Sequence, residues 1–254
     1  MLGEQHRRIG DLVADIPGLL RPEDELKLYE LAQQTAGPIF EIGTYRGRSA
    51  TIMALGARAG QGAMLISVDV DPKAQRAAAA ALATRGVADN VLLVRGSAAA
   101  ALRVLPGLAP RLTFIDGDHS VDGVRRDVAA LERVIPNGGL LLFHDFVDPR
   151  NDNPDVEDIG VKAGIADSWV ARECDLIGEY GVCGLFRRRE GGEISAGPPV
   201  IDARWRDSLR MQFLQRLRWP AGRAARRFLG ASPRAIRTRS LRHRGAYGRL
   251  ARTP

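Results

Sequence analysis

Five short apolar runs, each followed by a turn and a helix-like stretch, constrain the fold of this chain more than any other feature. They are Pro38–Ile42, Met64–Val68, Val91–Val94, Leu112–Ile115 and Leu140–Phe143. Strands that are apolar on both faces and alternate with helices form a parallel sheet that helices cover on both sides. Two further runs, Asp175–Glu179 and Val182–Arg187, are joined so closely that the last strand must be antiparallel. The sequence therefore predicts a doubly wound α/β domain with an antiparallel last strand.

The helix-like stretches carry local start and stop signals. Asp71-Pro72 opens an Ala-rich stretch that ends at Gly86, which fits the preference for proline at the start of a helix and glycine after its end. Residues 12–34 are predicted to be a helical preface and Gly160–Arg172 a later helix. The polar loop Asp148–Asp158 is rich in acids, Asn and Pro and is predicted to be mobile.

Charge divides the chain into two parts. Residues 202–254 hold 15 Arg and two acids, which leaves 22 basic and 28 acidic side chains, a net charge of −6, in residues 1–201. We therefore predict a domain at 1–190, a Gly- and Pro-containing linker at 191–201 and a basic tail at 202–254. The two cysteines support neither a disulfide framework nor a zinc site, and no signal segment or membrane span is evident, so a cytoplasmic location is expected.

A glycine turn follows the first predicted strand, from Glu41 to Ser49. Its E-x-G-x-x-x-G spacing differs from the G-x-G-x-x-G turn of dinucleotide sites, and the acid would repel a pyrophosphate but suits an ammonium or sulfonium group. An ordinary tight turn is the alternative. Asp69 closes the second strand, 26 residues after Gly43, where an acid can accept hydrogen bonds from ribose hydroxyls. Gly96-Ser97 follows the third strand, where the adenine edge would lie.

Acids and histidines follow the fourth and fifth strands, as Asp116-Gly117-Asp118-His119-Ser120 and His144-Asp145. Because carboxyl ends of neighbouring parallel strands meet, these side chains are predicted to converge. Asp116 and Asp145 could hold a hard divalent cation such as Mg²⁺, and His119 could act as a base. The alternative is that Asp118 or Ser120 caps the next helix and that the histidines are hydrogen-bonded without acting.

PIFEIGTYRGRSA, SVDVDP, LVRGSAAA, LTFIDGDHSVDGVRRDVAALERVIPNGG and LLLFHD resemble class I S-adenosylmethionine-dependent methyltransferases, in the order and spacing of that family. The similarity covers about Leu12–Arg189 and is greatest to small O-methyltransferases of the catechol and caffeoyl-CoA type and a bacterial D-G-D-H-S group. It implies a seven-stranded, Rossmann-like sheet, S-adenosylmethionine as cofactor and transfer to a hydroxyl of a small-molecule, sugar or lipid-linked acceptor.

The resemblance also implies roles by position. Asp116, His119 and His144 would be catalytic, and Asp116 and Asp145 would be metal ligands. Phe146 departs from the family, which has Asn or Asp there as a further ligand; a relative with an acid one position earlier would place His144 in that role. The implied cofactor contacts are Glu41, Gly43, Gly47 and Ser49 for the methionine part, Asp69 for the ribose, Ser97 near the adenine and Asp118 near the amine.

Two other functions remain open: an NAD(P)-dependent oxidoreductase on a related sheet, and a non-catalytic cofactor-binding module. For the tail, residues 203–219 have near-helical apolar spacing flanked by Arg. We hypothesise that the tail binds an anionic membrane surface, which would place the protein at the inner membrane surface. The alternatives are docking on the domain or on a second subunit, as in a homo-oligomer; nucleic acid is a weaker candidate because no binding module accompanies the tail.

Overall fold

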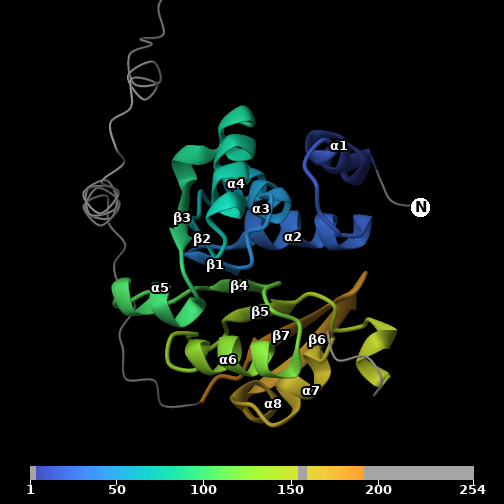
Figure 1. Ribbon diagram of the computed structural model, residues 1–254, viewed down its shortest axis with the longest axis vertical. Helices are drawn as coiled ribbons and strands as arrows, with labels where there is room; N and C mark the ends of the chain where they lie inside the picture. The colour runs from blue at the N-terminus through green and yellow to red at the C-terminus, as the bar shows by residue number, and fades with distance from the viewer. Residues whose placement is uncertain (1–3, 154–158, 192–254) are drawn as a thin grey trace, which may run out of the picture. The chain divides into compact units, whose positions relative to one another are not determined.

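The structure is a computed structural model and describes residues 4–153 and 159–191. In that part of the chain a single sheet has the strand order β3-β2-β1-β4-β5-β7-β6 (Figure 1). Strands β1 to β5 pair in parallel, and β7 is antiparallel to both β5 and β6. The strands are β1 (Ile39–Ile42), β2 (Leu65–Asp69), β3 (Val91–Arg95), β4 (Leu112–Ile115), β5 (Leu140–Phe143), β6 (Cys174–Tyr180) and β7 (Cys183–Arg188). The predicted seven-stranded fold with an antiparallel last strand is confirmed.

The strand register brings the functional motifs to one edge of the sheet. Ile42 of β1 is level with Val68 of β2 and with Ile115 of β4, and Ile115 is level with Phe143 of β5. The residues that follow these strand ends therefore emerge side by side. The chain order also reverses between β1 and β4, which is where open α/β sheets bind ligands.

Helices cover both faces of the sheet, with α1 to α4 on one face and α5 to α8 on the other (Figure 1). The helices are α1 (Glu4–Val13), α2 (Pro22–Gln34), α3 (Arg48–Ala59), α4 (Pro72–Thr84), α5 (Ala98–Val104), α6 (Val121–Leu131), α7 (Val161–Ala166) and α8 (Trp169–Glu173), with short 3-10 helices at Ala88–Asn90 and Pro149–Asp152. Asp71 caps α4 by accepting a hydrogen bond from the Lys73 amide, and Pro72 stands at its first turn, as the sequence indicates. No helix of the described residues is long and apolar enough to cross a membrane.

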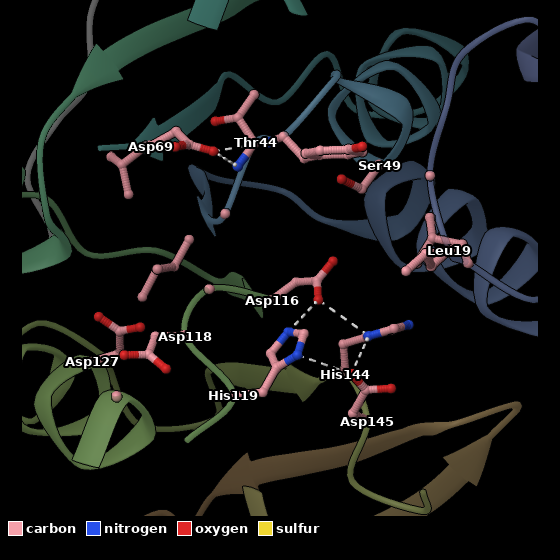
Figure 2. Close-up of a pocket in the computed structure, with 18 of the residues that line it drawn as sticks. Leu19, Thr44, Ser49, Asp69, Asp116, Asp118, His119, Asp127, His144 and Asp145 are labelled. Atoms are coloured by element: carbon pink, nitrogen blue, oxygen red, sulfur yellow. Dashed lines mark hydrogen bonds and ion pairs between the residues drawn. The ribbon is translucent and has the colours of Figure 1, made fainter. Parts of the chain in front are cut away.

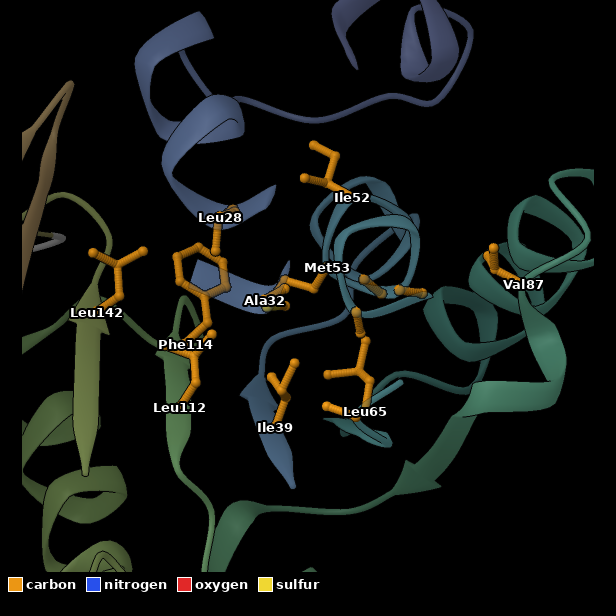
Figure 3. Packing of buried hydrophobic residues seen from close by; sticks show 14 of the residues in the cluster. Leu28, Ala32, Ile39, Ile52, Met53, Leu65, Val87, Leu112, Phe114 and Leu142 are labelled. Carbon is orange, nitrogen blue, oxygen red and sulfur yellow. The ribbon is translucent and has the colours of Figure 1, made fainter. Parts of the chain in front are cut away.

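The core under α2 and α3 fixes the sheet edge in place. Figure 3 shows Leu28 and Ala32 of α2 and Met53 of α3 facing Ile39, Leu65 and Phe114 of the strands. All six side chains are fully buried. Burying each large apolar side chain contributes about 1.5–3 kcal/mol, so this layer makes the sheet a rigid support for the loops at its edge.

Three expectations about elements need correction. The preface at 12–34 is two helices, α1 and α2, because the intervening residues form a loop anchored by other contacts. The helix expected at Gly160–Arg172 is interrupted: α7 ends at Ala166, and Ser168 caps the new helix α8 through the Val170 amide. In the polar loop, Pro149–Asp152 form a 3-10 helix that was not expected, and the Asn151 side chain donates to the Asp145 and Asp148 carbonyls; the mobility of the loop stays a prediction. Residues 154–158, and the tail at 192–254 with its predicted helix, lie outside the described residues.

Candidate active site

A cavity of about 1090 Å³ opens at the carboxyl ends of β1, β2, β4 and β5. Its wall includes the predicted residues Gly43, Ser49, Asp69, Ser97, Asp116, Asp118, His119, His144 and Asp145. The motifs thus converge as expected. Ligand sites usually have volumes of roughly 300–1,000 Å³, so this cavity has room for a cofactor and an acceptor together.

Asp69 is held in place by the glycine turn. Its Oδ2 accepts a hydrogen bond from the backbone amide of Thr44 at 3.1 Å (Figure 2). Oδ2 also accepts one from the Tyr45 amide at 2.8 Å, and Oδ1 accepts one from the Asp71 amide at 2.8 Å. A carboxylate has about four acceptor positions, so Asp69 keeps capacity for a ligand hydroxyl. The backbone of the turn thereby fixes a carboxylate at the place predicted for the ribose.

The two glycines of the turn have different tasks. Gly43 has a φ of 93°, and a Cβ there would lie 1.9 Å from the Asp116 carbonyl oxygen, so only glycine lets the ends of β1 and β4 meet. Gly47, with a φ of 86°, lies against Ala78, where a Cβ would come within 2.7 Å of Cα. Gly47 is not part of the cavity wall. Gly47 therefore lets α3 and α4 pack closely, and its expected cofactor contact stays a prediction.

Glu41 lies beneath the cavity instead of in its wall. The side chain is fully buried and accepts hydrogen bonds from the Ser49 hydroxyl at 2.5 Å and from the Ser67 hydroxyl. Burial raises the pKa of Glu41 to about 7, although these two hydroxyl donors counteract the shift. Ser49 does line the cavity. Glu41 thus orients Ser49, and the direct cofactor contact expected of Glu41 stays a prediction.

Ser97 and Asp118 line the cavity but also serve local structure. Ser97 caps α5 by accepting from the Ala100 amide at 3.3 Å. Asp118 accepts from the Ser120 amide at 3.1 Å and pairs with Arg126 at 2.8 Å, while Ser120 caps α6. The alternative that Ser120 is a helix cap is confirmed. The adenine and amine contacts of Ser97 and Asp118 stay predictions.

Four side chains form a compact group at the other end of the cavity, which we call the strand-end cluster: Asp116, His119, His144 and Asp145. One potential ligand atom from each lies within 4.8 Å of the others. His119 Nε2 is hydrogen-bonded to Asp116 Oδ1 at 3.0 Å, and His119 Nδ1 lies 3.1 Å from Asp145 Oδ2. His144 Nδ1 lies 3.1 Å from Asp116 Oδ1 and 3.3 Å from Asp145 Oδ2 (Figure 2).

A left-handed turn lets two consecutive residues join this cluster. Successive side chains of a strand point to opposite faces, so His144 and Asp145 would diverge if β5 continued. Asp145 instead has a φ of 55°, a conformation that Asp tolerates better than most residues. The Asn151 side chain donates to the Asp145 carbonyl at 2.7 Å and to the Asp148 carbonyl at 2.9 Å, which stabilises the turn. The polar loop therefore shapes the site.

The two acids and two imidazoles compensate each other's charge. Burial would raise the pKa of Asp116, but His119 and His144 lower it below its ordinary value. Burial would likewise lower the pKa of His144, but Asp116 and Asp145 raise it to about 10. The hydrogen bond with Asp116 raises the pKa of His119, against the effect of burial. The opposite charges of the acids and imidazoles therefore favour one another, and a divalent cation would supply positive charge at the same place.

The donor set fits a divalent cation. Two carboxylates and an imidazole are common ligands of such ions, and neither ring nitrogen of the buried His144 makes a hydrogen bond within the described residues. Phe146 cannot supply the oxygen that the family has there: its ring packs edge-on against Phe186, with centroids 5.3 Å apart, and abuts Gly184. The predicted metal role of Asp116 and Asp145 stays a prediction.

Two residues near the site, Arg48 and Asp127, lie within the quoted motifs but were given no role from the sequence. Arg48 lines the cavity and donates to Glu25 at 2.6 Å and to the carbonyls of Val13 and Ile16 at 2.7 Å each, so it holds the segment before α2. That segment contributes residues 17–21 to the wall. Asp127 also lines the wall; burial raises its pKa to about 6, with Arg126 opposing and Asp118 adding to the shift. The contacts of Arg48 reach residues that are distant in sequence, and Asp127 lies in an ordinary helical stretch, so motif spacing does not reveal these roles.

Comparison with known proteins agrees with this geometry. Residues 40–146 match the family described as a methyltransferase domain. This region therefore resembles a methyltransferase domain. The match spans β1 to the turn after β5 and so contains Asp69 and the strand-end cluster. The family resemblance inferred from the motifs is confirmed.

Solved structures with this fold include three O-methyltransferases or proteins so described. An O-methyltransferase from Bacillus cereus in complex with S-adenosylhomocysteine is 16% identical, with a TM-score of 0.56, over 75% of this chain and 92% of that one. A putative O-methyltransferase from Klebsiella pneumoniae is 22% identical, with a TM-score of 0.57, over 74% of this chain and 91% of that one. The O-methyltransferase TomG from Streptomyces achromogenes is involved in tomaymycin synthesis and was solved with S-adenosylmethionine. It is 23% identical, with a TM-score of 0.54, over 74% of this chain and 91% of that one. These likenesses show the fold. No curated protein matches the chain in sequence.

Proposed function

We propose that the domain transfers a methyl group from S-adenosylmethionine to a hydroxyl oxygen of an acceptor. The observation that carries the proposal is a single cavity with Asp69, fixed by the glycine turn, at one end and the strand-end cluster at the other. The methyltransferase match over this region supports the cofactor, and the neighbours solved with S-adenosylmethionine or S-adenosylhomocysteine have the same fold.

The chain's contribution to the reaction is to hold two reactants in line and to accept a proton. S-adenosylmethionine supplies an electrophilic methyl group on a sulfonium centre. Asp69 binds and orients the cofactor ribose, and the backbone of the glycine turn is close enough to contact its methionine part. Such positioning converts a reaction between two molecules into one within a complex and accounts for much of the rate of methyl transfer.

His119 is the base in this proposal. Its ring is the more exposed of the two imidazoles, 30% against 5% for His144, and it lines the cavity, so an acceptor hydroxyl can reach it. Asp116 fixes its orientation through the 3.0 Å hydrogen bond. A divalent cation held by Asp116 and Asp145 would lower the pKa of the acceptor hydroxyl.

The cavity also indicates the kind of acceptor. Leu19 is 91% exposed and Tyr45 57% exposed, and both belong to the cavity wall, as do Leu20, Ile159 and Val182. Large apolar side chains are left open to solvent at this wall, which favours an acceptor whose hydroxyl sits on an apolar or aromatic framework. This class includes lipid-linked molecules and small aromatic molecules.

A methyl-transfer screen tests the proposal. The full chain is incubated with S-adenosylmethionine labelled in the methyl group, divalent cations and a panel of phenols, hydroxylated lipids and sugars. We expect label in an oxygen-linked methyl group of an apolar acceptor, and loss of that product in Asp69→Ala but not in Asp175→Ala, whose acid pairs with Arg189 outside the cavity wall. Transfer only to nitrogen or carbon would overturn O-methylation; hydride exchange with NADH would favour the oxidoreductase.

A further inference from the structure

The side chain of Asp127, on α6, lies half-buried in the cavity wall. Among the described residues no hydrogen bond or ion pair reaches its carboxyl group, and the adjacent Arg126 pairs with Asp118 instead. Burial raises the pKa of Asp127 to about 6, which Arg126 opposes and Asp118 reinforces. Because a partly buried acceptor without a donor costs free energy, a ligand that brings a donor to this carboxyl group would be stabilised.

Gly117 leaves this carboxyl group uncovered. A Cβ at Gly117 would lie 3.0 Å from Asp127 Oδ2 and 3.2 Å from Ile42 Cγ2, so any side chain there would crowd the acid. Gly117 itself lines the cavity. Asp127 Oδ2 therefore lies against the loop that follows β4, with no side chain of that glycine between it and the cavity.

The neighbouring acid, Asp118, already has its donors (Figure 2). Its Oδ1 accepts from the Ser120 amide at 3.1 Å, and its Oδ2 pairs with Arg126 at 2.8 Å. The hydrogen bonds with Ser120 and the ion pair with Arg126 lower the pKa of Asp118 below its ordinary value. Of the two acids, Asp127 is the one whose acceptor capacity is not in use.

Asp127 lies at the end of the cavity where the purine is expected. Helices α5 and α6 cover the same face of the sheet and pack against each other (Figure 1). The start of α5 contributes Ser97 and Ala98 to the same cavity wall as Asp127. The Ser97 hydroxyl is engaged by the Ala100 amide as a helix cap, and Ala98 has no polar side chain. A donor on the edge of a base therefore has Asp127 as its strongest side-chain acceptor at this wall.

We propose that Asp127 accepts a hydrogen bond from the exocyclic 6-amino group of the cofactor's adenine and so makes the cavity selective for a base that carries this group. The inference rests on the proposed function, because it requires an adenosyl cofactor in this cavity. The 6-amino group has two N–H donors, and a carboxylate is an acceptor only. A site built around a donor rejects an analogue that lacks it, because the buried acceptor is then left unpaired.

The other strong donor of the cofactor is the ammonium group of its methionine part. The glycine turn and Ser49, which are expected to contact that part, lead into α3, whereas Asp127 is on α6 (Figure 1). These two helices cover opposite faces of the sheet. This separation favours the base over the ammonium group as the partner of Asp127.

Calorimetric titrations of the full chain with S-adenosylhomocysteine and with its analogue that has hydrogen in place of the 6-amino group test the inference. The wild type should bind S-adenosylhomocysteine about 10–100-fold more tightly than the analogue, the usual range for a hydrogen bond to a charged group. In Asp127→Ala the two ligands should bind within about threefold of each other. Asp127→Asn keeps an amide oxygen as acceptor and should retain part of the preference.

Two acids of the same segment provide matched controls. Asp118→Asn should keep the wild-type preference between the two ligands, because its carboxylate already has its donors. Asp122→Asn, outside the cavity wall, should keep both the preference and the affinity for S-adenosylhomocysteine. The thermal unfolding midpoint of each variant reports its folding, and the comparison of the two ligands in the wild type needs no variant.

Equal affinity of the wild type for the two ligands would overturn the inference and leave methyl transfer standing. A wild-type preference that Asp127→Ala retains would also overturn it, because the partner of the 6-amino group would then be another residue. Absence of binding of both ligands to the wild type would remove the proposed function and this inference with it.

Discussion

The two ends of the cavity are built by different means. At the Asp69 end, backbone amides of the glycine turn hold one carboxylate, so this contact does not use the side chains of Thr44 and Tyr45. At the strand-end cluster, four side chains from two strand ends hold each other, and their arrangement depends on a left-handed residue and an Asn clamp. The first end can be predicted from a local motif, whereas the second needs contacts from across the fold.

The largest effect should come from the cluster end. His119→Ala should lower kcat for the acceptor found in the screen by about 10²–10⁴-fold, the usual contribution of a general base. S-adenosylhomocysteine affinity should change by less than about threefold, because His119 is not assigned to the cofactor end. Steady-state kinetics and calorimetry on the same preparations measure both. An equal loss of rate and cofactor affinity would show that the two ends are not separable.

The opposite pattern is expected at the Asp69 end. Asp69→Ala should weaken S-adenosylhomocysteine binding about a hundredfold, because hydrogen bonds to a charged group are worth roughly 1.5–3 kcal/mol each and the glycine turn also loses its anchor. Calorimetry gives the affinity, and Asp175→Ala is the control. Unchanged affinity in Asp69→Ala would remove the ribose assignment.

Beneath the cavity, Glu41 should make stability depend on pH. The pKa of Glu41 is about 7 in the fold against an ordinary value of 4.5, so the folded state holds the proton more tightly. The resulting stabilisation is fully present below about pH 4.5 and is lost as the pH rises through about 7, by about 3 kcal/mol in all. Glu41→Gln cannot ionise, so its stability advantage over the wild type should grow over this range.

Urea unfolding of both proteins between pH 4.5 and 8.5 measures this difference. Glu179→Gln, at an exposed position of β6, should follow the wild type throughout. Parallel curves for the wild type and Glu41→Gln would mean that Glu41 is ionised in the fold, and the indirect role assigned to it through Ser49 would need revision.

The smallest effect on the cavity should come from removing the basic tail. A chain truncated after Ile201 should bind S-adenosylhomocysteine within about twofold of the full chain, because all residues assigned to the cavity precede the tail. The full chain should float with anionic liposomes, less so as salt is added, and the truncated chain should not. Equal flotation with neutral lipid, or none, would contradict the membrane hypothesis and leave docking or oligomerisation.

Much of the fold was accessible from the sequence because strand position is a local property. Apolar runs bounded by turns located β1 to β5 within about a residue, and the short Tyr180-Gly181 connection required the antiparallel β7. In the polar loop, composition indicates mobility but does not reveal that the Asn151 side chain donates to three backbone carbonyls. A local sequence pattern does not reveal these hydrogen bonds of Asn151.

Only part of the site could be predicted from the sequence, because sequence patterns report local structure and not contacts between distant residues. The ends of the predicted strands located Asp69, Asp116 and the His144-Asp145 pair, because the carboxyl ends of neighbouring parallel strands lie side by side. The motif did not reveal that Glu41 is fully buried and holds Ser49, or that Gly47 packs against Ala78, because a motif gives position along the chain and not depth. Asp24 lies 120 residues before His144, in an ordinary first turn of a helix. No sequence spacing could therefore predict that the two side chains are neighbours.

The most direct test of the central claim is a calorimetric titration of the full wild-type chain with S-adenosylhomocysteine, with NADH in a parallel titration. The account predicts one site with a Kd on the order of micromolar, about −8 kcal/mol, and no heat of binding from NADH. Saturable binding of NADH together with no binding of S-adenosylhomocysteine would contradict the assignment of this cavity to methyl transfer.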